Sequence, residues 1–191
     1  MKRLIFGVSG ASGWLLAAEV LKHFAACQNI ELHLVVSDAA KVVQKEEETP
    51  QNNINKFAVR TYDVKDMAAP IASGSWFCDG MIICPCSVNT LGAIACGLCS
   101  NLLQRAAIVT LKEQRPLILC VRETPFNKII LKNMLTLADS GASIMPFIPA
   151  FYAGFSMEAS IRQFSGHLLD ILHIPNSLRK HWKEDASFLQ V

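Results

Sequence analysis

Short, continuously apolar runs alternate along this chain with segments in which apolar residues recur every three or four positions. Runs that are apolar throughout are typical of parallel strands buried on both faces, whereas the wider spacing is typical of amphipathic helices. Strands are predicted at residues 3–9, 31–36, 58–62, 80–84, 116–121 and 142–146. Helices are predicted at residues 14–26, 39–45, 89–96, 102–112, 128–140 and 157–172. This alternation predicts an α/β domain with a doubly wound parallel sheet and right-handed crossovers.

The first predicted strand runs directly into a turn of small residues, Ser9-Gly10-Ala11-Ser12-Gly13, and a helical pattern follows at once. Glycines let the backbone approach a ligand closely, and the unpaired N–H groups at a helix start favour an anion. Ser9 and Ser12 add hydroxyl donors at the same place. The turn therefore predicts a phosphate site, at the carboxyl edge of the sheet where ligands of this architecture bind.

The glycine spacing and the end of the second strand favour a mononucleotide over a dinucleotide. Gly7-x-x-Gly10-x-x-Gly13 differs from the G-x-G-x-x-G pattern of dinucleotide sites. A carboxylate at the end of the second strand would favour the ribose of NAD, but Ser37 stands there and offers another phosphate donor. FMN is therefore the preferred ligand, and NAD is the alternative.

Two more strand ends carry polar residues. Residues 85–90, Pro-Cys-Ser-Val-Asn-Thr, follow one strand, and residues 122–125, Arg-Glu-Thr-Pro, follow another. Taken singly, Ser87 is explained as a helix cap, and an Arg122–Glu123 surface ion pair would contribute little. Three polar turns that end three parallel strands meet at one edge of a sheet, which favours the interpretation as a site.

Composition narrows the class of protein further. Of the 191 residues, 51% are hydrophobic and only 18% are charged, which indicates surface buried in an oligomer. The apolar runs are strand-length and fall short of the roughly 20 residues of a membrane helix, so no membrane span is expected. The net charge of +2, without a basic stripe, argues against nucleic acid as a partner.

The cysteines and the N-terminus predict a cytoplasmic protein. Seven cysteines, an odd number and mostly in apolar segments, are typical of reduced thiols, and the first residues lack a signal-peptide pattern. Cys84-Pro-Cys86 and Cys96-Gly-Leu-Cys99 have spacings found in zinc or redox sites. No histidine lies near them in the sequence, so we expect small buried thiols and no metal.

Taken together, the motifs of this chain resemble those of the UbiX-type flavin prenyltransferases over nearly the whole length. The matching segments are residues 9–13 (SGASG), 37–40 (SDAA), 69–75 (APIASGS), 84–87 (CPCS), 101–107 (NLLQRAA), 111–113 (LKE), 122–125 (RETP) and 149–152 (PAFY). The resemblance implies a flavodoxin-like, Rossmann-like single domain over residues 1–175 that binds FMN. It also implies a homododecamer with sites at subunit junctions, and a tail, residues 176–191, that packs on the site or on a neighbouring subunit.

The resemblance further implies an activity. It is a metal-independent transfer of a dimethylallyl group from dimethylallyl monophosphate to reduced FMN, first to N5 and then to C6. The product, prenylated FMN, would serve a UbiD-type decarboxylase, either in ubiquinone synthesis or in aromatic acid breakdown. Because phosphate leaves in this reaction, cations and a phenol must stabilise its growing negative charge.

Roles for individual residues are implied by position. The residues that would hold FMN are Gly10, Ala11, Ser12, Ser37, Ser87, Val88, Asn89, Thr90 and Arg122. Those that would grip the donor phosphate are Arg105, Lys112, Tyr152 and His167, of which Arg105 and Lys112 stand two helical turns apart. The catalytic set would be Glu47, Glu123, Lys112, Tyr152 and Ser12, with the two glutamates handling protons. Trp182 matches a tail aromatic that closes the site.

The chain departs from the family pattern at the donor site. The last predicted helix has His167 where the family has arginine or lysine, and the loop after Tyr152 is one residue shorter and lacks a proline. Histidine is only partly charged near pH 7 and has no guanidinium fork, so donor binding or donor identity is put in doubt. Arg162, five residues upstream, is expected to point elsewhere on the helix.

Two other functions stay open. One is an FMN-dependent decarboxylase that oxidises a C-terminal cysteine; that class uses a histidine near the first helix, and His23 lies too deep in it to fit well. The other is a non-catalytic FMN-binding or carrier subunit, supported by His167 and the shortened loop. Turnover of dimethylallyl monophosphate would separate prenyl transfer from both.

Overall fold

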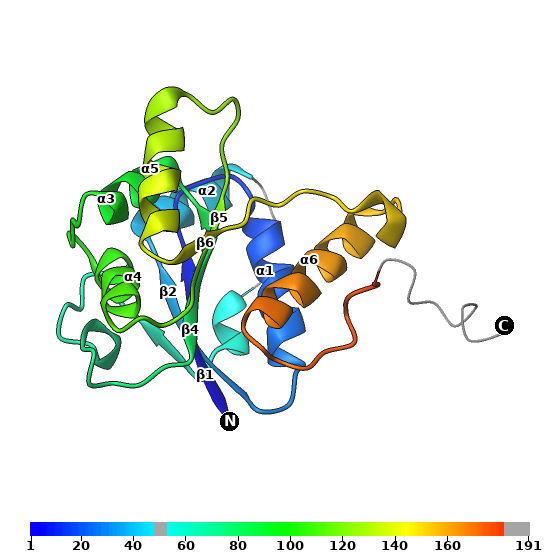
Figure 1. Cartoon of the computed structure of the whole chain (residues 1–191). Helices are drawn as coiled ribbons and strands as arrows, with labels where there is room; N and C mark the ends of the chain where they lie inside the picture. The colour runs from blue at the N-terminus through cyan, green and yellow to red at the C-terminus, as the bar shows by residue number, and fades with distance from the viewer. Residues whose placement is uncertain (48–52, 182–191) are drawn as a thin grey trace, which may run out of the picture. The chain divides into compact units, whose positions relative to one another are not determined.

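The computed structural model describes residues 1–47 and 53–181 of the chain (Figure 1). The chain divides into two compact units, one of residues 1–147 and one that begins at residue 148. We call them unit 1 and unit 2 and describe each by itself.

Unit 1 is built on a parallel sheet with the strand order β3-β2-β1-β4-β5-β6 (Figure 1). The strands are β1 (Lys2–Val8), β2 (Ile30–Val36), β3 (Arg60–Tyr62), β4 (Gly80–Cys86), β5 (Leu117–Val121) and β6 (Ala142–Ile144). Every neighbouring pair is parallel. The doubly wound parallel sheet predicted from the alternating pattern is confirmed, and its order is that of Rossmann-type folds.

Helices cover both faces of this sheet. They are α1 (Trp14–Ala25), α2 (Asp38–Glu46), α3 (Val88–Ala95), α4 (Leu102–Lys112) and α5 (Lys128–Asp139), with short 3-10 helices η1 (Ile54–Phe57) and η2 (Pro70–Ala72). α1 lies on one face, and α3, α4 and α5 lie on the other (Figure 1). Within residues 1–47 and 53–181, no helix combines the length and the apolar character needed to cross a membrane.

The two faces of β1 show why its residues are apolar throughout. Phe6 meets Phe24 of α1 edge-on, with ring centroids 6.4 Å apart. Ile5, on the opposite face, belongs to the core that contains Leu103 and Ala106 of α4. Because successive side chains of a strand point to opposite faces, a strand covered on both sides must be apolar at every position.

Unit 2 contains one long helix, as the apolar stripe predicted. η3 (Phe151–Ala153) leads into α6 (Met157–Ile171), and residues 172–181 follow. Ser156 caps α6: its hydroxyl accepts a hydrogen bond from the backbone N–H of Ala159 (3.0 Å). The proposed boundary between domain and tail at residue 175 stays a prediction.

Candidate active site

The order of the sheet reverses between β1 and β4, and the turns that follow these strands lie side by side. The Ser9 hydroxyl joins them: it donates to the backbone oxygen of Pro85 (2.9 Å) and accepts from the backbone N–H of Ser87 (2.8 Å). Ser9 is buried. The prediction that Ser9 offers a donor to a ligand is therefore wrong, because its hydrogen holds the two turns together. Such a switch point is where open α/β sheets bind ligands.

Gly10 is needed because the turn after β1 comes very close to the first turn of α2. A Cβ atom at position 10 would lie 2.4 Å from the Cβ of Ala39. No side chain fits there without displacing backbone, so Gly10 sets the approach of Ala11 and Ser12 to the start of α2.

Glu47 occupies the start of α1. Its carboxylate accepts hydrogen bonds from the backbone N–H groups of Gly13 (2.7 Å) and Trp14 (3.0 Å). Burial would raise the pKa of Glu47, but hydrogen bonds from Ser12, Gly13 and Trp14 and the charge of Arg122 outweigh it and hold the pKa below its usual value. The prediction that a ligand phosphate sits on these amides needs correction, because an ionised side chain of the protein takes that place.

Ser37 and Ser87 both serve as helix caps at the same edge. The Ser37 hydroxyl accepts from the N–H of Ala40 (3.1 Å) at the start of α2. The Ser87 hydroxyl accepts from the N–H of Thr90 (3.3 Å) and donates to its hydroxyl (3.1 Å) at the start of α3. The first turn of α3 carries no acidic residue. In contrast to α1, therefore, the positive end of α3 is not compensated by a carboxylate of its own first turn.

The end of β5 adds Arg122 and Glu123 to this edge. The Arg122 N–H donates to the backbone oxygen of Cys86 (3.0 Å), which fixes the β5 turn beside the β4 turn. The Arg122 charge acts on Glu47, so the ends of β1, β4 and β5 converge electrostatically as well as geometrically. Glu123 is half-buried and accepts from the N–H of Thr124 (3.0 Å). We call this set of strand ends the flavin edge.

Arg105 and Lys112 lie on α4 and share a face of that helix, as their spacing predicted. Both reach residues 72–74: Arg105 Nε donates to the backbone oxygen of Ala72 (3.0 Å), and the Lys112 ammonium, paired with Glu113, lies next to Gly74. Arg115 donates to the backbone oxygen of the same Gly74 (2.8 Å). Arg115 precedes β5 and Arg122 follows it, so about 17 Å of strand separates Lys112 and its neighbours from the flavin edge. One chain does not bring Lys112 to its own flavin edge.

Tyr152 and His167, the expected phosphate ligands of unit 2, lie near Arg179, a residue that no sequence motif indicated. Tyr152 accepts a hydrogen bond from Gln163 Nε2 (3.2 Å), and its side chain is also hydrogen-bonded to Arg179. Partial burial, followed by the charge of Arg179, lowers the pKa of His167. Trp182, expected to close the site, lies outside the described residues.

The cysteines lie as the sequence suggested for Cys84, Cys86 and Cys120, which are buried and free. Burial raises the pKa of the Cys120 thiol, so it stays protonated at neutral pH. Cys96 is exposed and Cys99 is partly exposed. In the part of the chain that the structure describes, no three His, Cys, Asp or Glu side chains are grouped as metal ligands would be.

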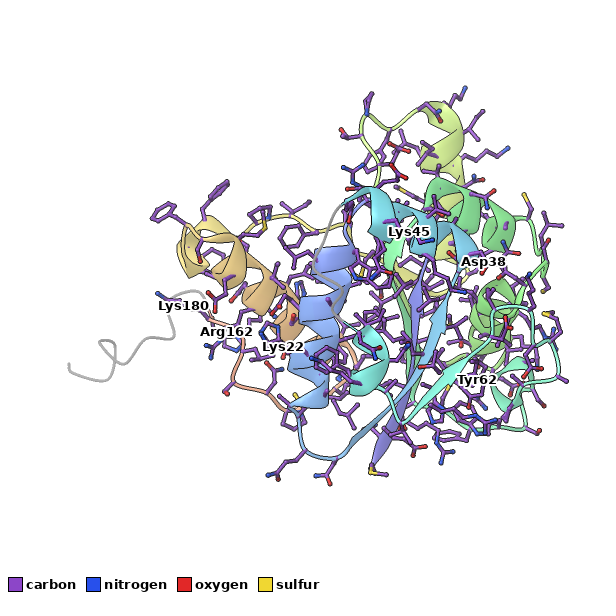
Figure 2. All side chains as sticks on the ribbon, turned by 180° about the vertical axis from the view of Figure 1, so that it is seen from behind. Lys22, Asp38, Lys45, Tyr62, Arg162 and Lys180 are labelled. Carbon is purple, nitrogen blue, oxygen red and sulfur yellow. The ribbon has the colours of Figure 1, made fainter. Side chains whose placement is uncertain are left out.

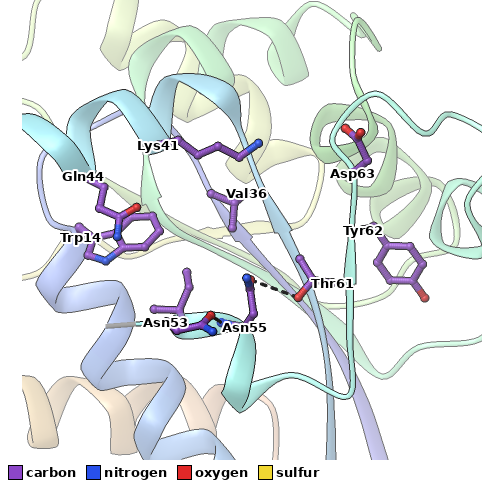
Figure 3. A pocket seen from close by; sticks show the side chains of 10 residues that line it. Trp14, Val36, Lys41, Gln44, Asn53, Asn55, Thr61, Tyr62 and Asp63 are labelled. Carbon is purple, nitrogen blue, oxygen red and sulfur yellow. Dashed lines mark hydrogen bonds between the residues drawn. The ribbon is translucent and has the colours of Figure 1, made fainter. Parts of the chain in front are cut away.

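A separate cavity of about 450 Å³ opens in unit 1 between α1, α2, η1 and β3 (Figure 3). Its walls include Trp14, Lys41 and Tyr62, and across it the Thr61 hydroxyl donates to Asn55 Oδ1 (3.3 Å). None of the residues expected to hold FMN lines this cavity. The flavin edge is therefore a different surface from this cavity.

Comparison with known proteins places these observations in a family. The Flavoprotein family matches residues 1–166. The chain is 41% identical over 190 residues to the flavin prenyltransferase LpdB of Lactiplantibacillus plantarum, covering 97% of this chain and all of that protein. Among solved structures it resembles AnUbiX (PadA1) in complex with FMN and dimethylallyl pyrophosphate (TM-score 0.90, 40% identity, 95% and 97% of the two chains). It equally resembles a dodecameric FMN-dependent UbiX-like decarboxylase of Escherichia coli O157:H7 (TM-score 0.90, 37% identity, 95% and 99%).

Proposed function

This chain belongs to the Flavoprotein family, and on that premise we propose that it is a flavin prenyltransferase. It transfers a dimethylallyl group from dimethylallyl monophosphate to reduced FMN. The observation that carries the proposal is the flavin edge, where Gly10, Glu47, Ser87 and Arg122 converge at the switch point of the sheet. The near full-length similarity to LpdB and to AnUbiX supports it.

The residues of the flavin edge fit FMN. Gly10 leaves no room for a side chain at the turn, so a flat ring can lie against the backbone of Ala11 and Ser12. Because Glu47 already occupies the amides of α1, the FMN phosphate belongs at the start of α3, where Ser87 and Thr90 present hydroxyls and no acid repels it. The others proposed to hold FMN are Ser37, Val88, Asn89 and Arg122.

Reduced FMN supplies the nucleophilic ring atoms, and the protein must manage protons around them. Glu123 is half-buried, and we assign to it the proton lost when the new ring closes. Glu47 is suited to a different task, because its lowered pKa keeps it ionised and its oxygens already accept from Ser12, Gly13 and Trp14. It orients the Ser12 hydroxyl toward the ligand side of the turn and holds a negative charge there.

The leaving phosphate requires positive charge from another place. Arg105 and Lys112 lie at the opposite end of β5 from the flavin edge of their own chain, so we propose that a second copy supplies them. The exposed apolar residues Ile129, Leu131 and Leu135 of α5 offer a surface for such assembly, and the E. coli relative is a dodecamer. Tyr152 and a cation of unit 2 complete the grip on the phosphate.

We also propose the wider setting implied by the resemblance. The prenylated FMN serves a UbiD-type decarboxylase in the cytoplasm, in ubiquinone synthesis or in aromatic acid breakdown. Residues 176–181 begin the tail that packs on α6, through contacts described below. Trp182 then closes the site.

The test is anaerobic. Purified protein, reduced FMN and dimethylallyl monophosphate are mixed, and the extracted flavin is analysed by mass spectrometry against a sample without donor. A flavin heavier by one C5H8 unit supports the transferase. Bound but unmodified FMN contradicts it and favours the carrier, and turnover of a peptide with a C-terminal cysteine would identify the decarboxylase.

A further inference from the structure

Unit 2 poses a problem of charge if the proposed function holds. A departing phosphate is best stabilised by a permanent cation, but the last turn-facing position of α6 expected to provide one is His167. Partial burial of the ring and the neighbouring Arg179 lower the pKa of His167, which leaves it neutral at pH 7. The positive charge must therefore come from another residue.

Gly166, next to His167, lets the chain that follows α6 return to the helix. A Cβ atom at position 166 would lie 2.8 Å from both the backbone nitrogen and the Cβ of Arg179, and 3.0 Å from Asn176 Oδ1. Asn176 shapes this return, because its side chain accepts from the N–H of Leu178 (3.1 Å). The contact exists only because position 166 has no side chain, and it delivers Arg179 to α6.

Gln163 fixes the same segment to the phenol of Tyr152. Its Oε1 accepts from the backbone N–H of Lys180 (2.7 Å), and its Nε2 donates to the backbone oxygen of Lys180 (2.9 Å). The same Nε2 donates to the Tyr152 hydroxyl (3.2 Å). One buried amide thus holds the residue after Arg179 in register with Tyr152.

The Arg179 guanidinium is held but not used up. Nη1 donates to Asp170 Oδ2 (2.8 Å), and the side chain is also hydrogen-bonded to Tyr152. Among the described residues, the buried Nε–H finds no acceptor. A cavity of about 400 Å³ opens beside Arg179, with Arg162 and Lys180 on its walls (Figure 2 shows both near the chain after α6). A guanidinium has five donors, so it can keep Asp170 and still bind an oxyanion.

We propose that Arg179, brought to α6 by the contact at Gly166, binds the phosphate of the prenyl donor beside Tyr152 in place of a cation at position 167. The proposal rests on the proposed function for the identity of the ligand. It makes the family's missing helix cation a relocated one: the charge sits thirteen residues after the Tyr–Gln–Arg contacts begin on α6 and reaches the same phenol from the tail.

The competing account is that Arg179 only clamps the tail to α6 through Asp170. Two substitutions separate the accounts. Arg179→Gln removes both the charge and the clamp, whereas Asp170→Asn loosens the clamp and keeps the guanidinium. Under the proposal, Arg179→Gln weakens the binding of dimethylallyl monophosphate to the FMN-loaded protein by about 10- to 100-fold, and Asp170→Asn weakens it by less than about threefold. Equal losses in the two variants would favour the clamp.

The binding is measured by isothermal titration, with FMN affinity and thermal stability determined for each variant. Arg60→Gln is the matched control, because Arg60 also contacts a tyrosine, lying over the ring of Tyr62 at 4.9 Å, but at the start of β3. It should leave donor affinity unchanged. A donor affinity of Arg179→Gln within about twofold of the original chain, with the fold intact, would overturn the proposal.

A second variant protects the test against a loss of local structure. His167→Arg placed in the Arg179→Gln background returns a guanidinium to α6 and should recover most of the lost donor affinity; no recovery in a folded, FMN-binding variant counts against the proposal. Because titration needs no turnover, the two proposals fail separately. Donor binding that depends on Arg179 without prenylated flavin sinks only the transferase, while prenylation that is indifferent to Arg179 sinks only the relocated cation.

Discussion

The flavin edge of unit 1 and the Arg179 group of unit 2 are built in different ways. The flavin edge consists of backbone turns and small hydroxyls at the ends of buried strands, joined by Ser9 across 2.8 and 2.9 Å. The Arg179 group consists of long side chains, brought together by one glycine contact and by the amide of Gln163. The fold itself therefore positions the flavin edge, whereas a few side-chain contacts position the donor group. Changes in one should leave the other intact.

The largest expected effect tests whether the flavin edge does chemistry as well as binding. Glu123→Gln should lower kcat for prenylated FMN by about 10²- to 10⁴-fold, because it removes the proton acceptor without changing the shape of the β5 turn. FMN affinity and donor affinity should change little. The matched control is Glu19→Gln on α1, where Glu19 pairs with Lys22 (3.0 Å). An unchanged kcat in Glu123→Gln would assign the proton to another group.

The next test makes the same substitution at one glycine of each region. In Gly10→Ala the new Cβ meets Ala39, and in Gly166→Ala it meets the backbone of Arg179, so each overpacks a close contact at a cost of about 1–3 kcal/mol. Gly10→Ala should weaken FMN binding, measured by quenching of flavin fluorescence, and leave the tail in place. Gly166→Ala should weaken donor binding and leave FMN affinity unchanged. Loss of both ligands in either variant would show that the two regions are not independent.

Helix caps give a smaller, paired test. Ser87→Ala and Ser156→Ala each remove a cap hydrogen bond, at the starts of α3 and α6, and each should lower the free energy of unfolding by about 0.5–2 kcal/mol. Only Ser87→Ala should also reduce FMN affinity, because only α3 receives the FMN phosphate. Urea unfolding and fluorescence titration measure the two quantities. Equal FMN affinities would place the phosphate elsewhere.

The smallest expected effect is on stability against pH, and it contrasts one histidine in each unit. Burial, against the opposing hydrogen bond from Glu31 (2.8 Å), lowers the pKa of His33, which is 5% exposed. Below about pH 6.5 the unfolded chain then binds a proton that the folded chain resists, so the free energy of unfolding falls as the pH drops from 7.5 to 5.5. His33→Gln should flatten this fall in urea unfolding, and exposed His167→Gln should alter it less. The reverse ranking would contradict the assignment.

Hydrophobic pattern was sufficient for the fold, because both faces of the strands are covered and the apolar runs are unbroken. All six strands were predictable, including the short β3, and so was the capped start of α6. The position of the flavin edge was predictable for the same reason, since polar turns after parallel strands must meet at one edge.

Side chains that leave their own element were not predictable. The capture of the α1 amides by Glu47 depends on where the end of α2 lies, and the use of Ser9 depends on the packing of two turns. The separation of Lys112 from the flavin edge follows from the direction of α4, which residue spacing does not give. Arg179 had no motif at all; its only signal was Gly166 in the middle of a helix, and a helix-interior glycine has many explanations.

The most direct test of the account is one anaerobic single-turnover experiment. Protein loaded with an equimolar amount of reduced FMN is mixed with dimethylallyl monophosphate, and prenylated flavin and free phosphate are measured in the same quenched samples. The account predicts that the two rise together, one phosphate for each prenylated FMN. Phosphate released while the flavin mass stays unchanged, or no release at all, would contradict it.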